Sequence, residues 1–266
     1  MQFLDNLDND LKLSARNALR DLWTHTSTAL EGNTLTLGDT AFVLNEGLTI
    51  GGKTLKEHQE VMGHAKAIEL IYANLSKSFI DENDLFLLHR AVLTEVVVDI
   101  FKPVGAFKEE PNGTYSRNKE GKTVYVEYAS PKDVSILINK WLTLLNSFQV
   151  DLNEDQALST YVQLHLSFVG IHPFFDGNGR LARLLANLAV LKSGHVPIMI
   201  DKTRRQEYIE LLSAYQQSVG QLTPSSQLIE MNHEYHRFSE FCKSCWTLSL
   251  EVLKEAHAIQ ARRNNF

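Results

Sequence analysis

Apolar residues recur at every third or fourth position along most of this chain, and this spacing restricts the fold more than any other feature. In residues 8–31, leucine, alanine and tryptophan follow this period, which is typical of a helix with one buried face. Gly32 and Asn33 come next and predict that this helix ends there. The same pattern predicts further helices over 37–46, 54–76, 82–99, 131–148, 155–170, 178–193, 203–218 and 236–262.

One segment departs from the helical pattern. Residues 105–130 contain Gly, Pro and Asn clusters, and 124–128 alternate as in a short strand. Asn112-Gly113 and Gly121 are turn signals. We therefore predict an all-α helical bundle with a small inserted β-hairpin. Because an isolated hairpin is marginally stable, we expect it to be mobile unless a ligand pins it.

The chain shows no repeat, low-complexity tract or long polar linker, which favours one helical domain over 1–266. Its 266 residues can bury a core without disulfides, and its two cysteines indicate no disulfide framework. The last residues, 260–266, are polar and charged, and we expect them to be disordered.

Charge and hydropathy narrow the class of protein. The formal net charge of −6 argues against non-specific binding to nucleic acid. The first residues lack the basic and apolar regions of a signal peptide, and the apolar runs are too short to span a membrane. We expect a cytoplasmic enzyme or binding protein with neither nucleic acid nor membrane as a partner.

The most informative stretch is GIHPFFDGNGRLAR, residues 170–183. His172 precedes Pro173, which predicts that the upstream helix ends there. The leucines from 181 onwards predict the buried face of a new helix. Gly177 and Gly179 therefore lie at a helix N-terminus, where backbone N–H groups can turn towards an anion and the helix dipole adds positive charge.

The side chains of this stretch suit phosphate chemistry. Arg180 and Arg183 lie one turn apart and present planar donors that match phosphate oxygens. Asp176 offers a carboxylate that suits Mg²⁺, and His172 is a histidine, whose unperturbed pKa is near neutral and suits a general base. Each feature alone occurs in ordinary turns and helices. Their combination within twelve residues favours a phosphate site.

Residues 172–183 resemble the signature of the Fic family without departure, and a looser resemblance extends over about 10–220. The resemblance implies a Fic-type fold and a protein adenylyltransferase. Such an enzyme moves AMP from ATP, with Mg²⁺, to a Ser, Thr or Tyr hydroxyl of a target protein. Members of the wider fold transfer phosphocholine, phosphate or UMP, but both arginines and the full Gly-Asn-Gly turn favour adenylyl transfer.

The resemblance also implies roles by position. His172 would deprotonate the target hydroxyl, and Asp176 would bind Mg²⁺. Tyr208 and Tyr215 share one face of 203–218 and are candidate adenine contacts, although core packing explains the same spacing. The residues assigned to ATP are Phe174, which would also anchor the loop, Gly177, Asn178, Gly179, Arg180, Arg183, Tyr208 and Tyr215.

The predicted hairpin resembles the flap with which the family clamps a target segment by strand addition. Val124, Tyr125 and Val126 would form the docking edge. A polar insert at about 109–122 makes this flap longer than is usual, so the residue that contacts the target stays open.

Residues 27–33, STALEGN, resemble the Fic inhibitory motif, in which Ser27, Glu31 and Gly32 would be regulatory. The implied mechanism is that Glu31 pairs with Arg183 and takes the place of the γ-phosphate. A capping box starting at Thr28 is an alternative, but the following glycine argues against a helix that continues. A solvated surface glutamate is another.

Two other functions stay open. The same pocket could remove AMP from a modified protein with Glu31, or the chain could be a catalytically silent helical interaction module. Within the single domain we expect an inhibitory segment at 1–36, a flap at 105–130, a catalytic loop at 172–183 and a C-terminal extension at 221–266. The helices at 54–76 and 236–262 could form a homodimer.

Overall fold

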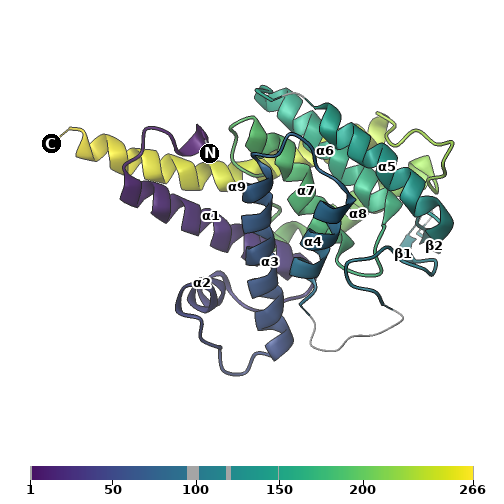
Figure 1. Cartoon of the computed structure of the whole chain (residues 1–266), viewed down its shortest axis with the longest axis horizontal. Helices are drawn as coiled ribbons and strands as arrows, with labels where there is room; N and C mark the ends of the chain where they lie inside the picture. The colour runs from purple at the N-terminus through teal and green to yellow at the C-terminus, as the bar shows by residue number, and fades with distance from the viewer. Residues whose placement is uncertain (1, 95–101, 118–120, 149, 266) are drawn as a thin grey trace.

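The computed structural model of the chain describes residues 2–94, 102–117, 121–148 and 150–265. In this part of the chain a bundle of helices carries one two-stranded antiparallel hairpin at its edge, which confirms the predicted fold class (Figure 1). The elements are η1 (Gln2–Leu4), α1 (Asn9–Leu30), α2 (Leu37–Glu46), α3 (Leu55–Asn74), α4 (Glu82–Val92), β1 (Gly113–Arg117), β2 (Thr123–Glu127), α5 (Pro131–Ser147), α6 (Glu154–Ile171), α7 (Asn178–Lys192), η2 (Lys202–Arg204), α8 (Arg205–Val219) and α9 (His233–Arg263).

Capping boxes start α2, α3, α4 and α6. In each box the N-cap side chain accepts from the N–H group three residues later, and that residue's side chain accepts from the N-cap N–H group. The pairs are Thr36 with Asp39, Thr54 with Glu57, Asp81 with Asp84, and Asn153 with Gln156. Two donors that a helix start leaves without partners are satisfied in each case. Local sequence therefore fixes these helix starts, and the predicted starts lie within one residue of them.

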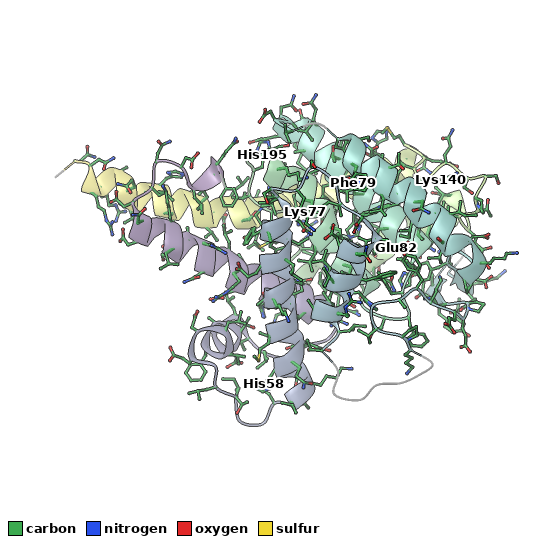
Figure 2. All side chains as sticks on the ribbon, in the orientation of Figure 1. His58, Lys77, Phe79, Glu82, Lys140 and His195 are labelled. Atoms are coloured by element: carbon green, nitrogen blue, oxygen red, sulfur yellow. The ribbon has the colours of Figure 1, made fainter. Side chains whose placement is uncertain are left out.

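Helices α6 and α7 form the centre of the core. Every residue of α7 from Arg180 to Leu191 is buried, because α1, α3, α4 and α6 all contact this helix. Side chains fill the space between the ribbons (Figure 2). Trp141 of α5 is fully buried and donates its indole N–H to the Leu164 carbonyl of α6 at 3.0 Å. The start of α7, which carries the loop of interest, is therefore held in the buried core of the molecule.

Helix α4 is shorter than predicted. It ends at Val92, with Leu93 at φ −105° and ψ 85°, and Thr94 is not helical. The predicted helix over 82–99 is therefore wrong at 93–94, and its remaining residues, 95–99, lie outside the described residues. The sequence following Leu93 is rich in β-branched residues, which lower helix propensity.

Helix α9 begins earlier than predicted, at His233 instead of 236. Asn232 is the N-cap, and its side chain accepts from the backbone N–H of Tyr235 at 3.1 Å. An asparagine at an N-cap satisfies one of the free N–H groups of the first turn, so the helix starts at this point.

The predicted disorder of 260–266 is wrong for 260–263, which continue α9. The side chain of Gln260 accepts from the backbone N–H of Asp8 at 2.7 Å. Arg263 forms ion pairs with Asp8 at 3.1 Å and Asp10 at 2.7 Å. These partners come from the opposite end of the chain, where α1 and α9 lie side by side (Figure 1). A local sequence pattern cannot show such a contact.

None of the helices in the described ranges is long and apolar enough to cross a bilayer.

Gly63 lies where α3 crosses α4. A Cβ atom at this position would lie 2.4 Å from the backbone carbonyl oxygen of Ala91 and 2.9 Å from Cγ2 of Thr94. Because the carbonyl belongs to a helix, it cannot rotate away. We expect Gly63→Ala to lower the free energy of unfolding by about 1–3 kcal/mol, measured by urea denaturation.

Gly38→Ala is the matched control. Gly38 is in the first turn of α2, and its Cβ atom would meet only Thr36 Oγ1, at 3.9 Å. We expect this change to be neutral or to stabilise by up to about 1 kcal/mol, because alanine restricts the unfolded chain. A Gly63→Ala protein as stable as wild type would contradict the close approach of α3 and α4.

Candidate active site

The connection between α6 and α7 begins at His172. Helix α6 ends at Ile171, as the following Pro173 predicted. His172 has φ 50° and ψ 60°, which is the left-handed region and not the extended region favoured before proline. Its N–H still donates to the Phe168 carbonyl at 2.9 Å. A non-glycine residue keeps this conformation only where its surroundings enforce it, and such residues concentrate at functional sites.

Asn178 locks the loop from within. Its amide group donates to the Phe174 carbonyl at 2.8 Å and accepts from the Phe174 N–H at 3.0 Å. The Phe174 side chain is fully buried and stacks on His89, with 3.9 Å between ring centroids. Phe174 is therefore placed as an anchor. Because the Asn178 side chain is used by the loop, only its backbone N–H remains for an anion.

The start of α7 is open to an external acceptor. Gly177 is its N-cap at φ 78° and offers no side-chain cap, so the first N–H groups have no intrahelical partner. Whereas Gly177 is left-handed, Gly179 has helical backbone angles. What its lack of a side chain provides is space, since a Cβ atom there would lie 2.7 Å from Glu31 Oε1. The carboxylate of Glu31 thus lies against the first turn of α7.

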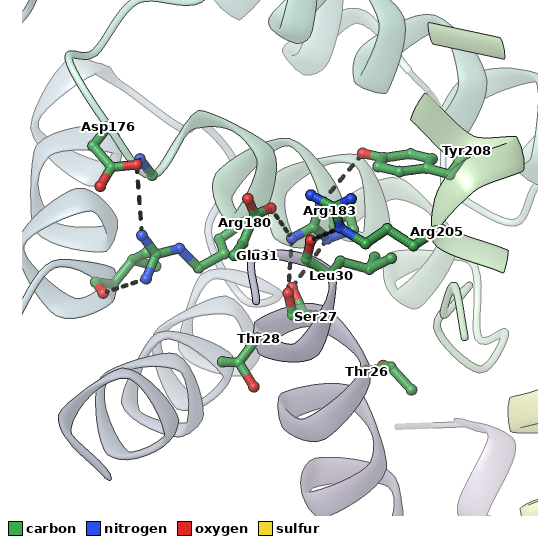
Figure 3. Close-up of polar contacts among 12 residues, drawn as sticks. Thr26, Ser27, Thr28, Leu30, Glu31, Asp176, Arg180, Arg183, Arg205 and Tyr208 are labelled. Atoms are coloured by element: carbon green, nitrogen blue, oxygen red, sulfur yellow. Dashed lines mark hydrogen bonds and ion pairs between the residues drawn. The ribbon is translucent and has the colours of Figure 1, made fainter. Parts of the chain in front are cut away.

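The guanidinium of Arg183 forms hydrogen bonds with residues of the predicted inhibitory motif (Figure 3). Its Nη2 group donates to Glu31 Oε1 at 2.7 Å and to the Ser27 carbonyl at 2.9 Å. Its Nε group donates to Ser27 Oγ at 3.0 Å, and its Nη1 group donates to the Tyr208 hydroxyl at 3.3 Å. The structure therefore brings Ser27 of α1, and Glu31 directly after this helix, onto Arg183 of α7.

The end of α1 explains why these groups converge. Helix α1 ends at Leu30 and the chain turns at Gly32, at φ 103°, as predicted. Its last four carbonyl groups lack intrahelical partners. The middle two accept from N–H groups just beyond the helix. The carbonyls of Ser27 and Leu30 accept from Arg183 at 2.9 Å and from Arg205 at 2.7 Å. Two cations at a helix C-terminus are also favoured by the helix dipole.

Glu31 and Arg183 each stabilise the charged form of the other. Burial on its own would raise the pKa of Glu31, but the attraction and hydrogen bond of Arg183 outweigh it, and the pKa is lowered. Burial would lower the pKa of Arg183, whereas Tyr208 and Glu31 raise it, and the net direction is upward. The side chain of Arg183 is 3% exposed and that of Glu31 is 39% exposed. Glu31 is therefore a charged group on the open side of a buried cation.

Arg180 and Asp176 form the second half of this cluster (Figure 3). Arg180 is buried, with Nη1 3.5 Å from the Val92 carbonyl and Nη2 3.7 Å from Asp176 Oδ1. Its Nε atom has no partner among the described residues. Asp176 accepts from the Gly177 N–H at 2.5 Å, and its side chain is 60% exposed. An exposed carboxylate beside an anion site fits Mg²⁺, which prefers one or two carboxylates together with phosphate oxygens and water.

His172 has the protonation pattern of a base. Its Nδ1–H donates to the Val169 carbonyl at 3.3 Å, so the lone pair lies on Nε2. Burial, and then the charge of Lys108, lower the pKa of His172 to about 3. The ring of Tyr128 stacks on the imidazole, with 3.7 Å between centroids. A neutral imidazole with a free Nε2 can accept a proton.

Several residues that hold this loop carry no signal in the sequence. His89 donates from Nε2 to the Asp176 carbonyl at 3.2 Å and accepts at Nδ1 from the Gly105 N–H at 2.8 Å. Burial lowers the pKa of His89 to about 4, which agrees with this neutral pattern. Asn112 donates to the Phe174 carbonyl at 3.1 Å. Both residues are distant in sequence from 172–183, and no local signal marks them.

The two tyrosines of α8 occupy different places. Tyr208 is 3% exposed, and its hydroxyl accepts from Arg183 and donates to His165 Nε2 at 3.0 Å. Tyr215 is also buried, and its hydroxyl accepts from the Glu230 N–H at 3.1 Å, apart from the arginine cluster. The structure therefore brings only Tyr208 to Arg183. Adenine contact by either tyrosine stays a prediction.

The hairpin pairs β1 with β2 and places Tyr115 opposite Tyr125. Tyr125 is exposed, whereas Val124 and Val126 are half-buried. Ser116 of β1 contacts Ser213 of α8. These contacts seat the hairpin on the bundle, and its predicted mobility and docking role stay predictions.

Tyr208→Phe tests the bridge between Arg183 and His165. The change removes one hydroxyl and leaves a donor of Arg183 and Nε2 of His165 without this partner in a buried place. We expect a loss of about 1–3 kcal/mol in the free energy of unfolding, measured in urea. Unchanged stability would show that the bridge contributes nothing.

Glu31→Gln tests the charge of the Arg183 pair. Because the folded pKa of Glu31 lies below its usual 4.5, the carboxylate stabilises the fold above that pH, and the contribution is lost as the pH falls through the folded value. We expect wild type to have the higher melting temperature at neutral pH and the difference to shrink in acid. A difference that is equal at both pH values would contradict the ion pair.

Comparison with known proteins agrees with this geometry. A family model described as Fic/DOC family matches residues 79–190. Protein adenylyltransferase Fic of Drosophila mojavensis is 35% identical over 190 residues, which cover 70% of this chain and 34% of the relative. Protein adenylyltransferase fic-1 of Caenorhabditis elegans is 32% identical over 216 residues, covering 80% and 39%. This chain thus spans little more than a third of the length of these relatives.

Solved structures share the fold. A Fic domain-containing signaling protein from Bacteroides thetaiotaomicron superposes with a TM-score of 0.79 at 25% identity, covering 96% of this chain and 93% of the other. A fragment of Fic-1 from C. elegans gives a TM-score of 0.71 at 25% identity, covering 97% and 69%. The family match, the shared fold and the loop from His172 to Arg183 together place this chain in the Fic/DOC family.

Proposed function

We propose that this chain is an auto-inhibited protein adenylyltransferase that moves AMP from ATP to a Ser, Thr or Tyr hydroxyl of a target protein. The contact between Glu31 and Arg183 at 2.7 Å carries this proposal. A helix start and a buried guanidinium form a site suited to phosphate, and a carboxylate of the same chain occupies it.

The proposed chemistry is an in-line displacement at the α-phosphorus of ATP. The target oxygen forms a bond to phosphorus, the bond to the β-phosphate bridging oxygen breaks, and pyrophosphate leaves. His172 accepts the proton of the target hydroxyl at Nε2. Its low pKa, about 3, keeps it unprotonated before substrate binds, and the negative phosphates would raise its basicity.

The other groups of the site would bind and orient ATP. The first N–H groups of α7, Arg180 and Arg183 would neutralise the phosphate oxygens, which favours the transfer through positioning and charge. Asp176 would hold Mg²⁺, and the ion would supply charge neutralisation across the phosphates. The target segment would add to the hairpin along Val124, Tyr125 and Val126.

Inhibition follows from competition for Arg183. Glu31 and a γ-phosphate both need the open side of this guanidinium, so ATP would bind with its α-phosphate turned away from the target. Arg183 would keep Ser27 and Tyr208 as partners when Glu31 leaves. A bias of about 4 kcal/mol against the productive pose corresponds to about a thousandfold in rate.

Removal of AMP from a modified protein is the second candidate. The observation that favours it is that Glu31 is charged and partly exposed, and that its charge acts on His172. A carboxylate in this place could orient a water molecule for attack on the AMP–protein bond. The intact His172 and Asp176 argue against the third candidate, a silent interaction module.

Removal of the Glu31 side chain should release the transfer activity. We expect Glu31→Gly, incubated with ATP and Mg²⁺, to gain the mass of one AMP per modified hydroxyl, because Arg183 becomes available to the γ-phosphate. Wild type should gain little, and Glu31→Gly/His172→Ala should gain none, because the base is lost. Intact-protein mass spectrometry measures all three.

Glu46→Gly is the matched control, because it removes an exposed glutamate at the end of α2, outside the Arg183 cluster. It should behave as wild type. If Glu31→Gly binds ATP but stays as inactive as His172→Ala on itself and on added protein, the inhibitory role of Glu31 is wrong. Loss of AMP from a modified protein with wild type, but not with Glu31→Gln, would favour the second candidate.

A further inference from the structure

The ring of Tyr128 lies flat against the imidazole of His172. The ring centroids are 3.7 Å apart and the planes differ by 2°. Tyr128 directly follows strand β2, whereas His172 caps α6. The stack therefore joins the trailing end of the hairpin to the proposed base.

The imidazole needs this support, because its own hydrogen bonding is weak. Among the described residues, the one hydrogen bond of the ring is from Nδ1 to the Val169 carbonyl at 3.3 Å, which is longer than a typical N–H···O bond. A single long bond does not define the plane of a ring. Close parallel packing does, because rotation of His172 about its side chain would bring the ring edge into Tyr128.

Both backbone hydrogen-bonding groups of Tyr128 have partners. Its N–H donates to the Asn112 carbonyl at 3.0 Å, and its carbonyl accepts from the Gln221 side chain at 2.8 Å. Asn112 also donates to the Phe174 carbonyl, so one residue fixes Tyr128 and the catalytic loop relative to each other. The position of the stack is therefore set by backbone contacts.

Tyr128 contacts His172 through its ring and not through its hydroxyl. Within the described residues the hydroxyl has no hydrogen bond, although the side chain is only 9% exposed. Burial raises the pKa of Tyr128 to about 12, so the group stays a neutral phenol and is unsuited to proton transfer near neutral pH. A phenylalanine at this position could stack on His172 in the same way, whereas a leucine could not.

We propose that Tyr128 is a positioning residue for His172. Its ring holds the imidazole in one plane, with Nδ1–H on Val169 and the Nε2 lone pair open to the acceptor hydroxyl. Because Tyr128 follows β2 directly, the base is aligned when the hairpin is seated. The catalytic meaning of this alignment rests on the proposed function, whereas the alignment itself can be measured without it.

The kinetic test uses Tyr128→Leu and Tyr128→Phe, each in the Glu31→Gly protein, with pyrophosphate release from ATP and Mg²⁺ as the readout. A small misplacement of a reacting group lowers rate more than affinity, so we expect Tyr128→Leu to lower kcat about 10- to 100-fold with the KM for ATP within about twofold. Tyr128→Phe should keep kcat. A Leu variant as fast as its parent, or a Phe variant as slow as Leu, would overturn the proposal.

The second test needs no activity. In the wild-type chain of 266 residues with ¹⁵N-labelled histidine, the His172 signals are identified by their loss in His172→Ala. We expect wild type and Tyr128→Phe to show one tautomer with Nδ1 protonated and ring protons shifted by the stacked ring. Tyr128→Leu should show both tautomers and no such shift, at a melting temperature that confirms a folded protein. Unchanged His172 signals in Tyr128→Leu would overturn the proposal.

The two tests separate this proposal from the proposed function. If Glu31→Gly with Tyr128 intact releases no pyrophosphate, the adenylyltransferase assignment fails, and the histidine signals alone decide whether Tyr128 positions His172. If the signals change as expected but kcat of an active enzyme does not, the stack exists without positioning the base for the reaction, and the proposal is wrong.

Discussion

The site is organised around one buried positive charge, the guanidinium of Arg183. A charge this deeply buried is stable only with paired partners, and they come from Ser27 of α1, from Glu31 directly after this helix and from Tyr208 of α8. The packing of α1 against α7 therefore also neutralises the charge of Arg183. An anion that replaces Glu31 would meet a guanidinium already oriented by the other two partners.

Inhibition by this arrangement would require little change of structure. The carboxylate of Glu31 lies at the edge of the cluster, against the first turn of α7, where Gly179 leaves room for it. The rest of α1 is held by other contacts, including Arg205 on the Leu30 carbonyl and Arg263 on the first turn. Exchange of one carboxylate for a phosphate could therefore proceed while α1 stays folded.

Sequence predicted those parts of the fold and the site whose determinants are local. Pro173 ended α6, and Gly32 ended α1, because backbone sterics act within a few residues. The contacts of His89, Asn112 and Tyr128 with the loop could not be predicted, because they join segments far apart and use residue types common elsewhere. The same reason explains the error at 260–263, where Arg263 depends on Asp8 and Asp10.

These long-range contacts divide the site into two halves that meet at His172. In the proposed function, the nucleotide half would be built by the end of α1, the start of α7 and Tyr208, all in the helical bundle. The acceptor half would be built by the hairpin, which Ser116 connects to α8 and Asn112 connects to the loop. Tyr128 directly follows the hairpin, and its ring stacks on the imidazole of His172. The proposed base therefore has the right orientation only when both halves are in place. In the proposed reaction, a protein hydroxyl presented on the seated hairpin would thus be preferred over water as the acceptor of AMP.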